Sequence, residues 1–170
     1  MSDLELNRPV PDFELADLEG RPHDLGSQRG RIVIVNFWSC ECPHSERTDR
    51  IILSMLVQWE PQVVLFTVAS NRNETPADLL AAARQRRLPF VLRDEDCRIA
   101  DLFNAQTTPH IFAVDREGLL RYRGGVDDVT FRNRTPTRFH LDEAVEAMLE
   151  GRAPEPAETP CYGCTIVREI

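Results

Sequence analysis

Apolar runs and amphipathic stretches alternate along the chain in an order that predicts strands and helices. The runs RIVIVNFW at 31–38 and VVLFTVAS at 63–70 have the length and β-branched content of strands that are buried on both faces. Pro43 fits the first turn of the helix between them. That helix carries apolar residues at helical spacing, namely Ile51, Ile52, Met55, Leu56 and Trp59.

The alternation continues through the second half of the chain. Thr75 as N-cap and Pro76 as first helical residue open another helix. The remaining expected elements are a strand at 90–94, a short helix at 97–104, two strands at 109–115 and 119–125 joined by the turn REG, and an amphipathic helix at 139–151. The order β-α-β-α-β-α-β-β-α predicts an α/β fold, with a central mixed sheet flanked by helices.

A change of composition divides the chain at Gly151. Residues 1–151 hold the whole alternating pattern, and their length suits one domain with its own core. Residues 152–170 begin with the proline-rich RAPEPAETP, which predicts an extended, semi-rigid linker. They end with CYGCTIVREI, so the linker leads to a tail that carries two cysteines.

The formal net charge of −8 narrows the range of partners, because such a chain repels phosphate backbones and anionic membrane surfaces. The N-terminus shows no basic stretch followed by an apolar one, and no apolar run reaches the roughly 20 residues that span a bilayer. We therefore expect a cytoplasmic protein with no nucleic-acid or membrane partner.

Four of the five cysteines fall into two clusters, Cys40 with Cys42 and Cys161 with Cys164. Clustered thiols in a reducing compartment indicate redox chemistry or metal binding. Cys42 follows the first buried strand and precedes Pro43, so it lies at the start of a helix, where free N–H groups lower a thiol pKa. This position predicts a nucleophilic Cys42.

The residues near Cys42 can affect its thiol in several ways. A protonated His44 adds to stabilisation of the thiolate, and Trp38 is expected to pack beside the thiol and shield it. Cys40 either pairs with Cys42 in a small, strained ring or acts as a small buried hydrophobe. The interpretation of Cys42 as a redox nucleophile assigns no metal ion and no cofactor to the protein.

Two longer motifs carry a family resemblance. IVIVNFWSCECP, followed by TTPHIFAVDREGLLRYRGG, resembles the thioredoxin fold, and more narrowly the redoxin family of alkyl hydroperoxide reductases and thiol-specific antioxidants (AhpC/TSA). PVPDFELADLEGRPHDLGSQRGRIVIVNFW is similar to the opening of that family, while YRGGVDD and the C-terminal GCTI resemble a peroxiredoxin-like subgroup. The resemblance covers roughly residues 9–151. It implies an oxidoreductase with antioxidant activity that serves cell redox homeostasis.

The resemblance also implies roles for individual residues. Cys42 occupies the nucleophilic position, and Thr108–Pro109 is the cis-proline loop that faces it, where a substrate strand pairs beside the thiol. The implied substrate groove consists of Trp38, Pro43, His44, Thr108 and Pro109. The implied partners are protein or small-molecule disulfides, together with a thioredoxin-type or glutathione-type reductant.

The chain departs from both branches of this family. Thioredoxins carry Cys-X-X-Cys, and Ser45 stands here where the second cysteine is usual. Peroxiredoxins carry proline and threonine or serine seven and three residues before the reactive cysteine; Ser39 fits the second position, but Val35 replaces the proline. We therefore favour thiol–disulfide exchange, with thiol-dependent reduction of hydroperoxides as the alternative.

The tail is the predicted source of the second thiol. Cys164 lies thirteen positions after Gly151, and a segment of this length spans at most about 45 Å when extended, whereas the radius of gyration of such a domain is about 15 Å. We predict that Cys164 resolves Cys42 and that Cys161 pairs with Cys164 or relays the disulfide outward. Gly163 would let the backbone turn close to the thiol. Cys40, Cys161 and an external thiol are the other candidates for resolving Cys42.

Two interpretations from other classes remain open. Cys40, Cys42, Cys161 and Cys164 supply four thiolates, which would suit a structural zinc ion, although Cys-X-Cys is tighter than the usual zinc spacing. Alternatively, the protein is a redox-inactive binding module that keeps the thioredoxin groove for a protein partner.

Overall fold

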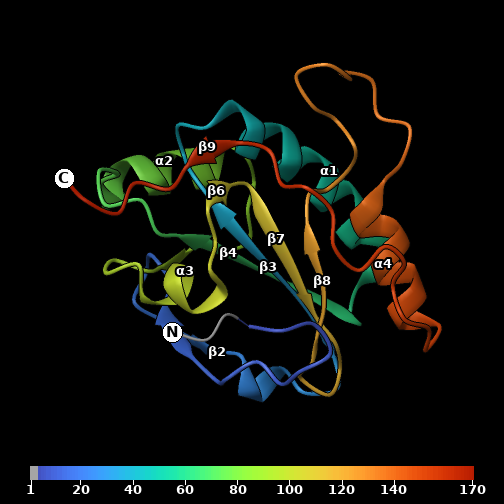
Figure 1. Ribbon diagram of the computed structural model, residues 1–170. Helices are drawn as coiled ribbons and strands as arrows, with labels where there is room; N and C mark the ends of the chain where they lie inside the picture. Colours follow the sequence, from blue (N-terminus) through green and yellow to red (C-terminus); the bar gives the residue numbers. More distant parts are fainter. Residues whose placement is uncertain (1–3) are drawn as a thin grey trace.

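Five strands form the central sheet, in the order β5-β4-β3-β7-β8 (Figure 1). They are β3 (Ile32–Trp38), β4 (Val63–Ala69), β5 (Leu92–Arg93), β7 (His110–Val114) and β8 (Leu120–Gly124). The central strand β3 runs parallel to β4 and antiparallel to β7. This computed structural model describes residues 4–170. The predicted mixed sheet, with parallel crossovers first and a hairpin near the end, is confirmed.

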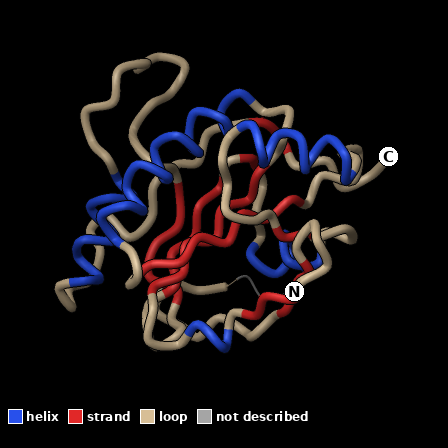
Figure 2. Tube along the Cα trace, turned by 180° about the vertical axis from the view of Figure 1, so that it is seen from behind, coloured by secondary structure: helices blue, strands red, loops and turns tan. Residues whose placement is uncertain are grey.

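The four predicted helices are also confirmed, and they lie on both sides of the strands (Figure 2). They are α1 (Pro43–Trp59), α2 (Pro76–Gln85), α3 (Arg98–Phe103) and α4 (His140–Leu149). The Thr75 side chain accepts a hydrogen bond from the backbone N–H of Asp78 at 3.2 Å, as an N-cap should. Capping residues and prolines in the sequence therefore predicted where the helices begin.

Several short elements were not predicted. Near the N-terminus these are the hairpin strands β1 (Glu14–Ala16) and β2 (Pro22–Asp24), and the 3₁₀ turn η1 (Gly26–Gln28). The other two, β6 (Thr107–Thr108) and β9 (Cys164–Thr165), pair antiparallel with each other. Strands of two or three residues carry no periodic pattern, so sequence alone does not reveal them.

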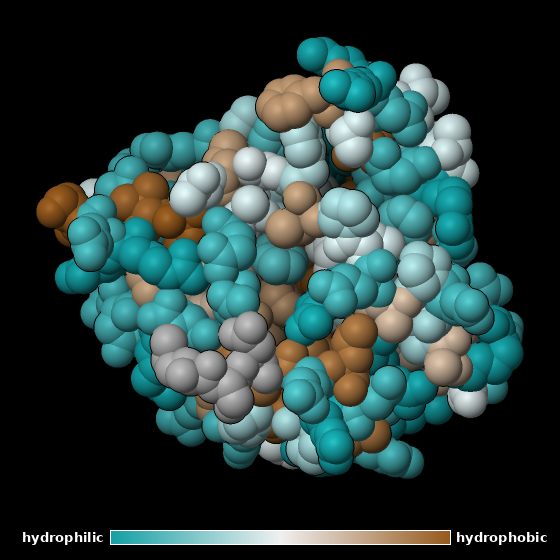
Figure 3. All heavy atoms as spheres, in the orientation of Figure 1, coloured by the Kyte–Doolittle hydropathy of each residue, from teal (hydrophilic) through white to brown (hydrophobic). Residues whose placement is uncertain are grey.

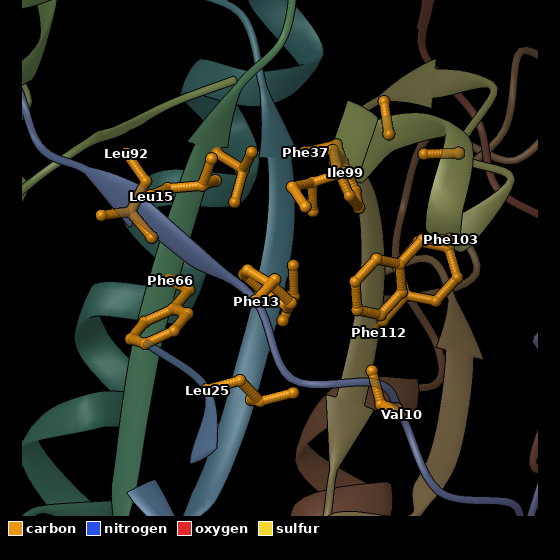
Figure 4. Packing of buried hydrophobic residues seen from close by; sticks show 14 of the residues in the cluster. Val10, Phe13, Leu15, Leu25, Phe37, Phe66, Leu92, Ile99, Phe103 and Phe112 are labelled. Atoms are coloured by element: carbon orange, nitrogen blue, oxygen red, sulfur yellow. The ribbon is translucent and has the colours of Figure 1, made fainter. Parts of the chain in front are cut away.

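Each face of the sheet has its own hydrophobic core. Helices α1 and α4 cover one face, where Ile52 and Val145 pack against alternate residues of β3. The N-terminal segment and α3 cover the other face, and Figure 4 shows Phe13 between Phe66 and Phe103. The Phe13 ring meets both rings edge-on, with centroids 6.4 and 5.9 Å apart.

The buried face of α1 differs from the prediction in its composition. Ile52, Leu56 and Trp59 are buried as expected, but Ile51 and Met55 are only partly buried. Three polar residues of the first turns are buried instead: Ser45, Thr48 and Asp49. The N-terminal half of α1 therefore faces the polar surroundings of Cys42, while its C-terminal half packs on the sheet.

The tail lies against the domain and crosses the same end of the sheet as β6 (Figure 1). It first follows β8, where the Arg123 N–H donates to the Ala157 carbonyl at 3.0 Å and the Thr159 N–H donates to the Arg123 carbonyl at 3.1 Å. Thr159 is buried, and its Oγ1 lies 2.6 Å from the Tyr122 hydroxyl. The tail then continues as β9.

Within residues 4–170, no helix has the length and apolar character needed to cross a membrane. On the face shown in Figure 3, hydrophobic residues form separate patches within a mostly hydrophilic surface.

Replacement of Tyr122 by phenylalanine tests how the tail is held to β8. The Tyr122 hydroxyl donates to the Gly125 carbonyl at 2.6 Å and bonds Thr159, and it is buried. We expect Tyr122→Phe to lower the free energy of unfolding by about 1 kcal/mol, measured by urea denaturation. The control is Tyr162→Phe, because Tyr162 also lies in the tail but is only half-buried, so loss of its hydroxyl should change little. Equal effects of the two substitutions would contradict this account.

Candidate active site

Cys42 is the N-cap residue of α1, at the junction of β3 and the helix where the sequence placed it. Its backbone is extended, with φ −85° and ψ 118°, and Pro43 begins the helix directly after it. The side chain is only 2% exposed. The Cys42 sulfur therefore sits at the positive end of a helix, but beneath other groups.

The loop that faces Cys42 contains a cis Thr108–Pro109 bond, as the family resemblance implied. The carbonyl oxygen of Thr108 lies 3.1 Å from Cys42 Sγ and accepts a hydrogen bond from the thiol. Thr108 and Pro109 are both buried. The cis-proline loop thus forms the wall opposite the sulfur.

Cys164 is the other sulfur at this site. β9 pairs antiparallel with β6, and Cys164 lies directly across from Thr108. The Sγ atoms of Cys42 and Cys164 are 2.8 Å apart, and all five cysteines are free thiols in this structure. Cys164 remains exposed although it contacts the buried Cys42. The structure therefore brings together the two sulfurs that the sequence paired.

The electrostatics of this pair favour a thiolate on Cys42. Burial raises the pKa of Cys42, but hydrogen bonds from the Cys164 thiol and the Ser45 N–H outweigh it, and the net pKa is lowered. The pKa of Cys164 is raised to about 11, by burial and by its hydrogen bond to Cys42. Cys42 is accordingly the sulfur that ionises first, and Cys164 holds its proton and donates it toward that thiolate.

Cys40 is less suited to exchange. Its backbone N–H donates to Glu74 Oε1 at 2.6 Å, and its side chain packs against the cluster around Trp38. Burial and the neighbouring Glu74 carboxylate raise the pKa of Cys40 to about 12. Cys40 therefore stays protonated near neutrality, which agrees with the interpretation of a small packed hydrophobe.

Cys161 lies three residues before Cys164, next to Thr107. Its sulfur accepts a hydrogen bond from Thr107 Oγ1 at 3.3 Å, and it is half-buried. The tail cysteines thus flank the β6 edge, with Cys164 next to Cys42. Whether Cys161 relays a disulfide stays a prediction of the sequence.

Trp38 does not line the groove, contrary to the prediction. It is wholly buried in a small hydrophobic cluster; its indole N–H donates to Asp49 Oδ2 at 2.7 Å, and the Arg86 guanidinium lies over its ring. The other groove residues lie near the sulfur pair: Pro43 is exposed, and His44 is half-buried. The His44 ring meets the Tyr162 ring edge-on at 4.9 Å.

Three polar residues of this site were missed by the sequence analysis. Arg86 donates to the carbonyls of Ser39 and Cys40 and forms an ion pair with Asp49, while Glu74 holds the Cys40 N–H. Burial raises the pKa of Asp49 to about 6, although the Trp38 and Arg86 contacts oppose this rise. Asp49 lies on the same face of α1 as Ile52, and this helical spacing was the sequence signal from which its burial could have been predicted.

A cleft of about 300 Å³ opens beside the sulfur pair. Its walls come from the first turns of α1, the loop after β8 and the tail, and include His44, Arg47, Pro109, Arg134, Pro160 and Tyr162. Arg47 is paired with the buried Asp127 at 2.5 Å. In the described part of the chain, no three His, Cys, Asp or Glu side chains converge to hold a metal ion, so the four thiols of the zinc alternative do not form one site.

Comparison with known proteins places the chain in a family. A sequence model of the AhpC/TSA family matches residues 6–123, which is more than half of the chain. The chain belongs to the AhpC/TSA family. The redoxin resemblance is therefore confirmed.

Curated relatives of this AhpC/TSA protein include thiol-disulfide oxidoreductase ResA of Geobacillus thermodenitrificans, 30% identical over 113 residues. That match covers 66% of this chain and 64% of the relative. Methylamine utilization protein MauD of Paracoccus versutus is 27% identical over 144 residues, which cover 85% of this chain and 66% of MauD. The AhpC/TSA chain thus spans just under two thirds of the length of these relatives.

Solved structures confirm the thioredoxin-like fold of the AhpC/TSA protein. A hypothetical protein of Sinorhizobium meliloti superposes with a TM-score of 0.86 at 25% identity, over 97% of this chain and 95% of that one. An uncharacterized conserved protein of Geobacillus kaustophilus gives a TM-score of 0.87 at 24% identity, over 98% and 93%. Both likenesses extend over nearly the whole chain, so they include the tail region.

Removal of the Cys164 thiol tests its effect on Cys42. Cys164→Ala deletes a hydrogen-bond donor to the thiolate, so the pKa of Cys42 should rise toward the ordinary value of about 8.5. Cys164→Ser is the matched control, because its hydroxyl can still donate and should keep the pKa lowered. The measurement is the pH dependence of Cys42 alkylation, followed by mass spectrometry. Identical profiles for alanine and serine would contradict a role for this hydrogen bond.

The raised pKa of Asp49 predicts a dependence of stability on pH. The folded protein holds the Asp49 proton up to pH about 6, whereas the unfolded chain releases it near pH 3.9. Stability from this group is therefore present at low pH and lost as pH rises through that window, by roughly 2–3 kcal/mol. Asp49→Asn should remove this fall, seen in urea denaturation at several pH values. Parallel curves for variant and wild type would show the assignment to be wrong.

Proposed function

We propose that this protein is a thiol-disulfide oxidoreductase in which Cys42 and Cys164 form the redox pair. The observation that carries the proposal is the 2.8 Å separation of the two sulfurs, held by pairing of β9 with β6. The lowered pKa of Cys42 supports its role as nucleophile. The name of the ResA relatives, thiol-disulfide oxidoreductase, supports the same class of reaction.

The proposed reaction exchanges two electrons. The Cys42 thiolate attacks one sulfur of a substrate disulfide, a Cys42–substrate bond forms, and the other substrate sulfur leaves as a thiolate that takes up a proton. Cys164 then loses its proton and attacks the Cys42 sulfur, which releases the second substrate thiol. The substrate is reduced to a dithiol, and Cys42–Cys164 is oxidised to a disulfide. The reverse sequence oxidises a substrate dithiol.

The partners we propose are disulfides of polypeptide chains, because the β6 edge pairs with an extended backbone. An external dithiol of the thioredoxin or glutathione type would regenerate the reduced pair. Reduction of hydroperoxides is the second candidate reaction, because Val35 replaces the proline of the peroxidase motif.

Gly163 offers the sharpest test of the sulfur pair. A Cβ at this position would overlap the Thr108 carbonyl oxygen, which is backbone and cannot move aside easily. We expect Gly163→Ala to shift the tail and slow formation of the Cys42–Cys164 disulfide by about tenfold or more. Non-reducing peptide mapping after brief oxidation measures the bond, and wild type should show it.

The control for this test is Thr165→Ala in the same strand, because that side chain is exposed and the substitution leaves the backbone pairing intact. It should form the disulfide at the wild-type rate. If oxidised wild type links Cys42 to Cys40 or forms no internal bond, the proposed redox pair is wrong.

A further inference from the structure

The tail occupies the edge of the sheet that a substrate strand would use. Cys164 and Thr165 pair with both residues of β6, so no second backbone can pair there at the same time. Gly163 packs against the Thr108 carbonyl and the Pro109 ring, which leaves no space between tail and loop. In this arrangement Cys42 is 2% exposed, whereas Cys164 is exposed.

Three residues after β9 attach the tail to the domain, and we call Ile166–Arg168 the C-terminal anchor. Ile166 is 3% exposed and belongs to the same core as Phe37 and Phe103. The Val167 N–H donates to Asn71 Oδ1 at 2.7 Å, and the Val167 carbonyl accepts from the Arg72 N–H at 3.0 Å. The anchor thus combines a buried side chain with backbone hydrogen bonds.

Arg168 completes the anchor with two contacts on α3 and the segment after it. Its Nε forms an ion pair with Asp101 at 2.9 Å, and its guanidinium also donates to the Ala105 carbonyl at 2.5 Å. A terminus held in this way is ordered by specific contacts, since chain ends without them are usually frayed.

A separate attachment holds the tail before β9. Thr159 is buried against Tyr122, and the Gly125 N–H donates to Thr159 Oγ1 at 3.2 Å. Release of the anchor would therefore loosen β9 and the residues after it, while Thr159 stays on β8 and Cys161 and Tyr162 keep their contacts with Thr107 and His44. The freed segment remains tethered beside the site, so its return is intramolecular and fast compared with binding of a second protein.

The anchor is also linked to the loop that carries the cysteines. Asn71, which accepts from Val167, donates to Glu74 Oε2 at 2.5 Å. Glu74 in turn accepts from the Cys40 N–H. Two buried side chains thus connect the tail to the backbone two residues before Cys42.

We propose that the C-terminal anchor determines specificity by deciding which strand lies beside Cys42. While Ile166–Arg168 are docked, Cys164 is the thiol beside Cys42, and a polypeptide disulfide reaches Cys42 after the anchor releases. The inference rests on the proposed function only in taking Cys42 as the nucleophile. Ile166 and Arg168 are positioning residues, because they act through the placement of β9.

The test measures how fast each cysteine of the reduced, full-length protein reacts with iodoacetamide, with the modified residues quantified by mass spectrometry. Labelling of a buried group follows the fraction of molecules in which it is open. Arg168→Ala should raise the rate at Cys42 about fivefold, because it removes a charged hydrogen bond and an ion pair. Ile166→Ala should raise it about tenfold or more.

Arg152→Ala is the matched control for Arg168→Ala. Arg152 also lies after α4 and carries the same charge, but within residues 4–170 its guanidinium bonds only the exposed Glu150. Labelling of Cys42 should stay at the wild-type rate in this variant. Ile166 lies in the core and its variant can lose stability, so the surface variant Arg168→Ala decides the result.

A second measurement tests whether release of the tail admits a polypeptide disulfide to Cys42. In a Cys164→Ser background, mixed-disulfide formation at Cys42 is compared for a small probe, bis(2-hydroxyethyl) disulfide, and for an unfolded polypeptide that holds one disulfide. Arg168→Ala should accelerate both reactions, because each probe needs Cys42 to be uncovered, and the polypeptide reaction should gain at least as much as the small one. No acceleration of the polypeptide reaction, or equal Cys42 labelling in Arg168→Ala and Arg152→Ala, would overturn the proposal.

The two hypotheses fail in different experiments. Absence of a Cys42–Cys164 disulfide from oxidised protein contradicts the proposed redox pair, whereas iodoacetamide labelling of reduced protein does not require that bond. If the disulfide forms and anchor substitutions leave Cys42 labelling unchanged, only the role of the anchor is wrong.

Discussion

The antiparallel pairing of Cys164 with Thr108 is the contact on which the rest of the site depends. It brings a sulfur from the end of the chain to 2.8 Å from Cys42, and it covers Cys42 so that the thiol is nearly inaccessible. Without it, the helix start and the cis-proline loop would face solvent with one thiol between them. The same pairing therefore supplies the second sulfur and restricts access to the first.

Burial and hydrogen bonding oppose each other at Cys42. Removal of water disfavours a thiolate, and donors from Cys164 and the first turn of α1 more than compensate, so the pKa of Cys42 is lowered. Cys40, only two residues away, lacks such donors and faces the Glu74 carboxylate, so its pKa rises to about 12. The difference in pKa between Cys42 and Cys40 thus follows from the groups around each thiol, since both side chains are cysteines.

A buried polar network holds the segment between β3 and α1. Asp49 binds the Trp38 indole and Arg86, and Arg86 reaches the carbonyls of Ser39 and Cys40. The arginine thereby fixes the backbone that ends at Cys42, in a region where strand and helix hydrogen bonds are both interrupted. Trp38 is part of this support, which explains why it is buried and does not line the groove.

The order of strands and helices, the start of α1 at Pro43 and the placement of Cys42 as its N-cap followed from the sequence, because periodicity and capping are local properties. The family motif added the cis bond at Pro109. The polar residues Glu74 and Arg86 could not be assigned in this way, since each joins segments that are distant along the chain. The docking of the tail also required the folded domain: β6 and β9 have two residues each, and the anchor residues Val167 and Arg168 bind Asn71 and Asp101, which are distant along the chain.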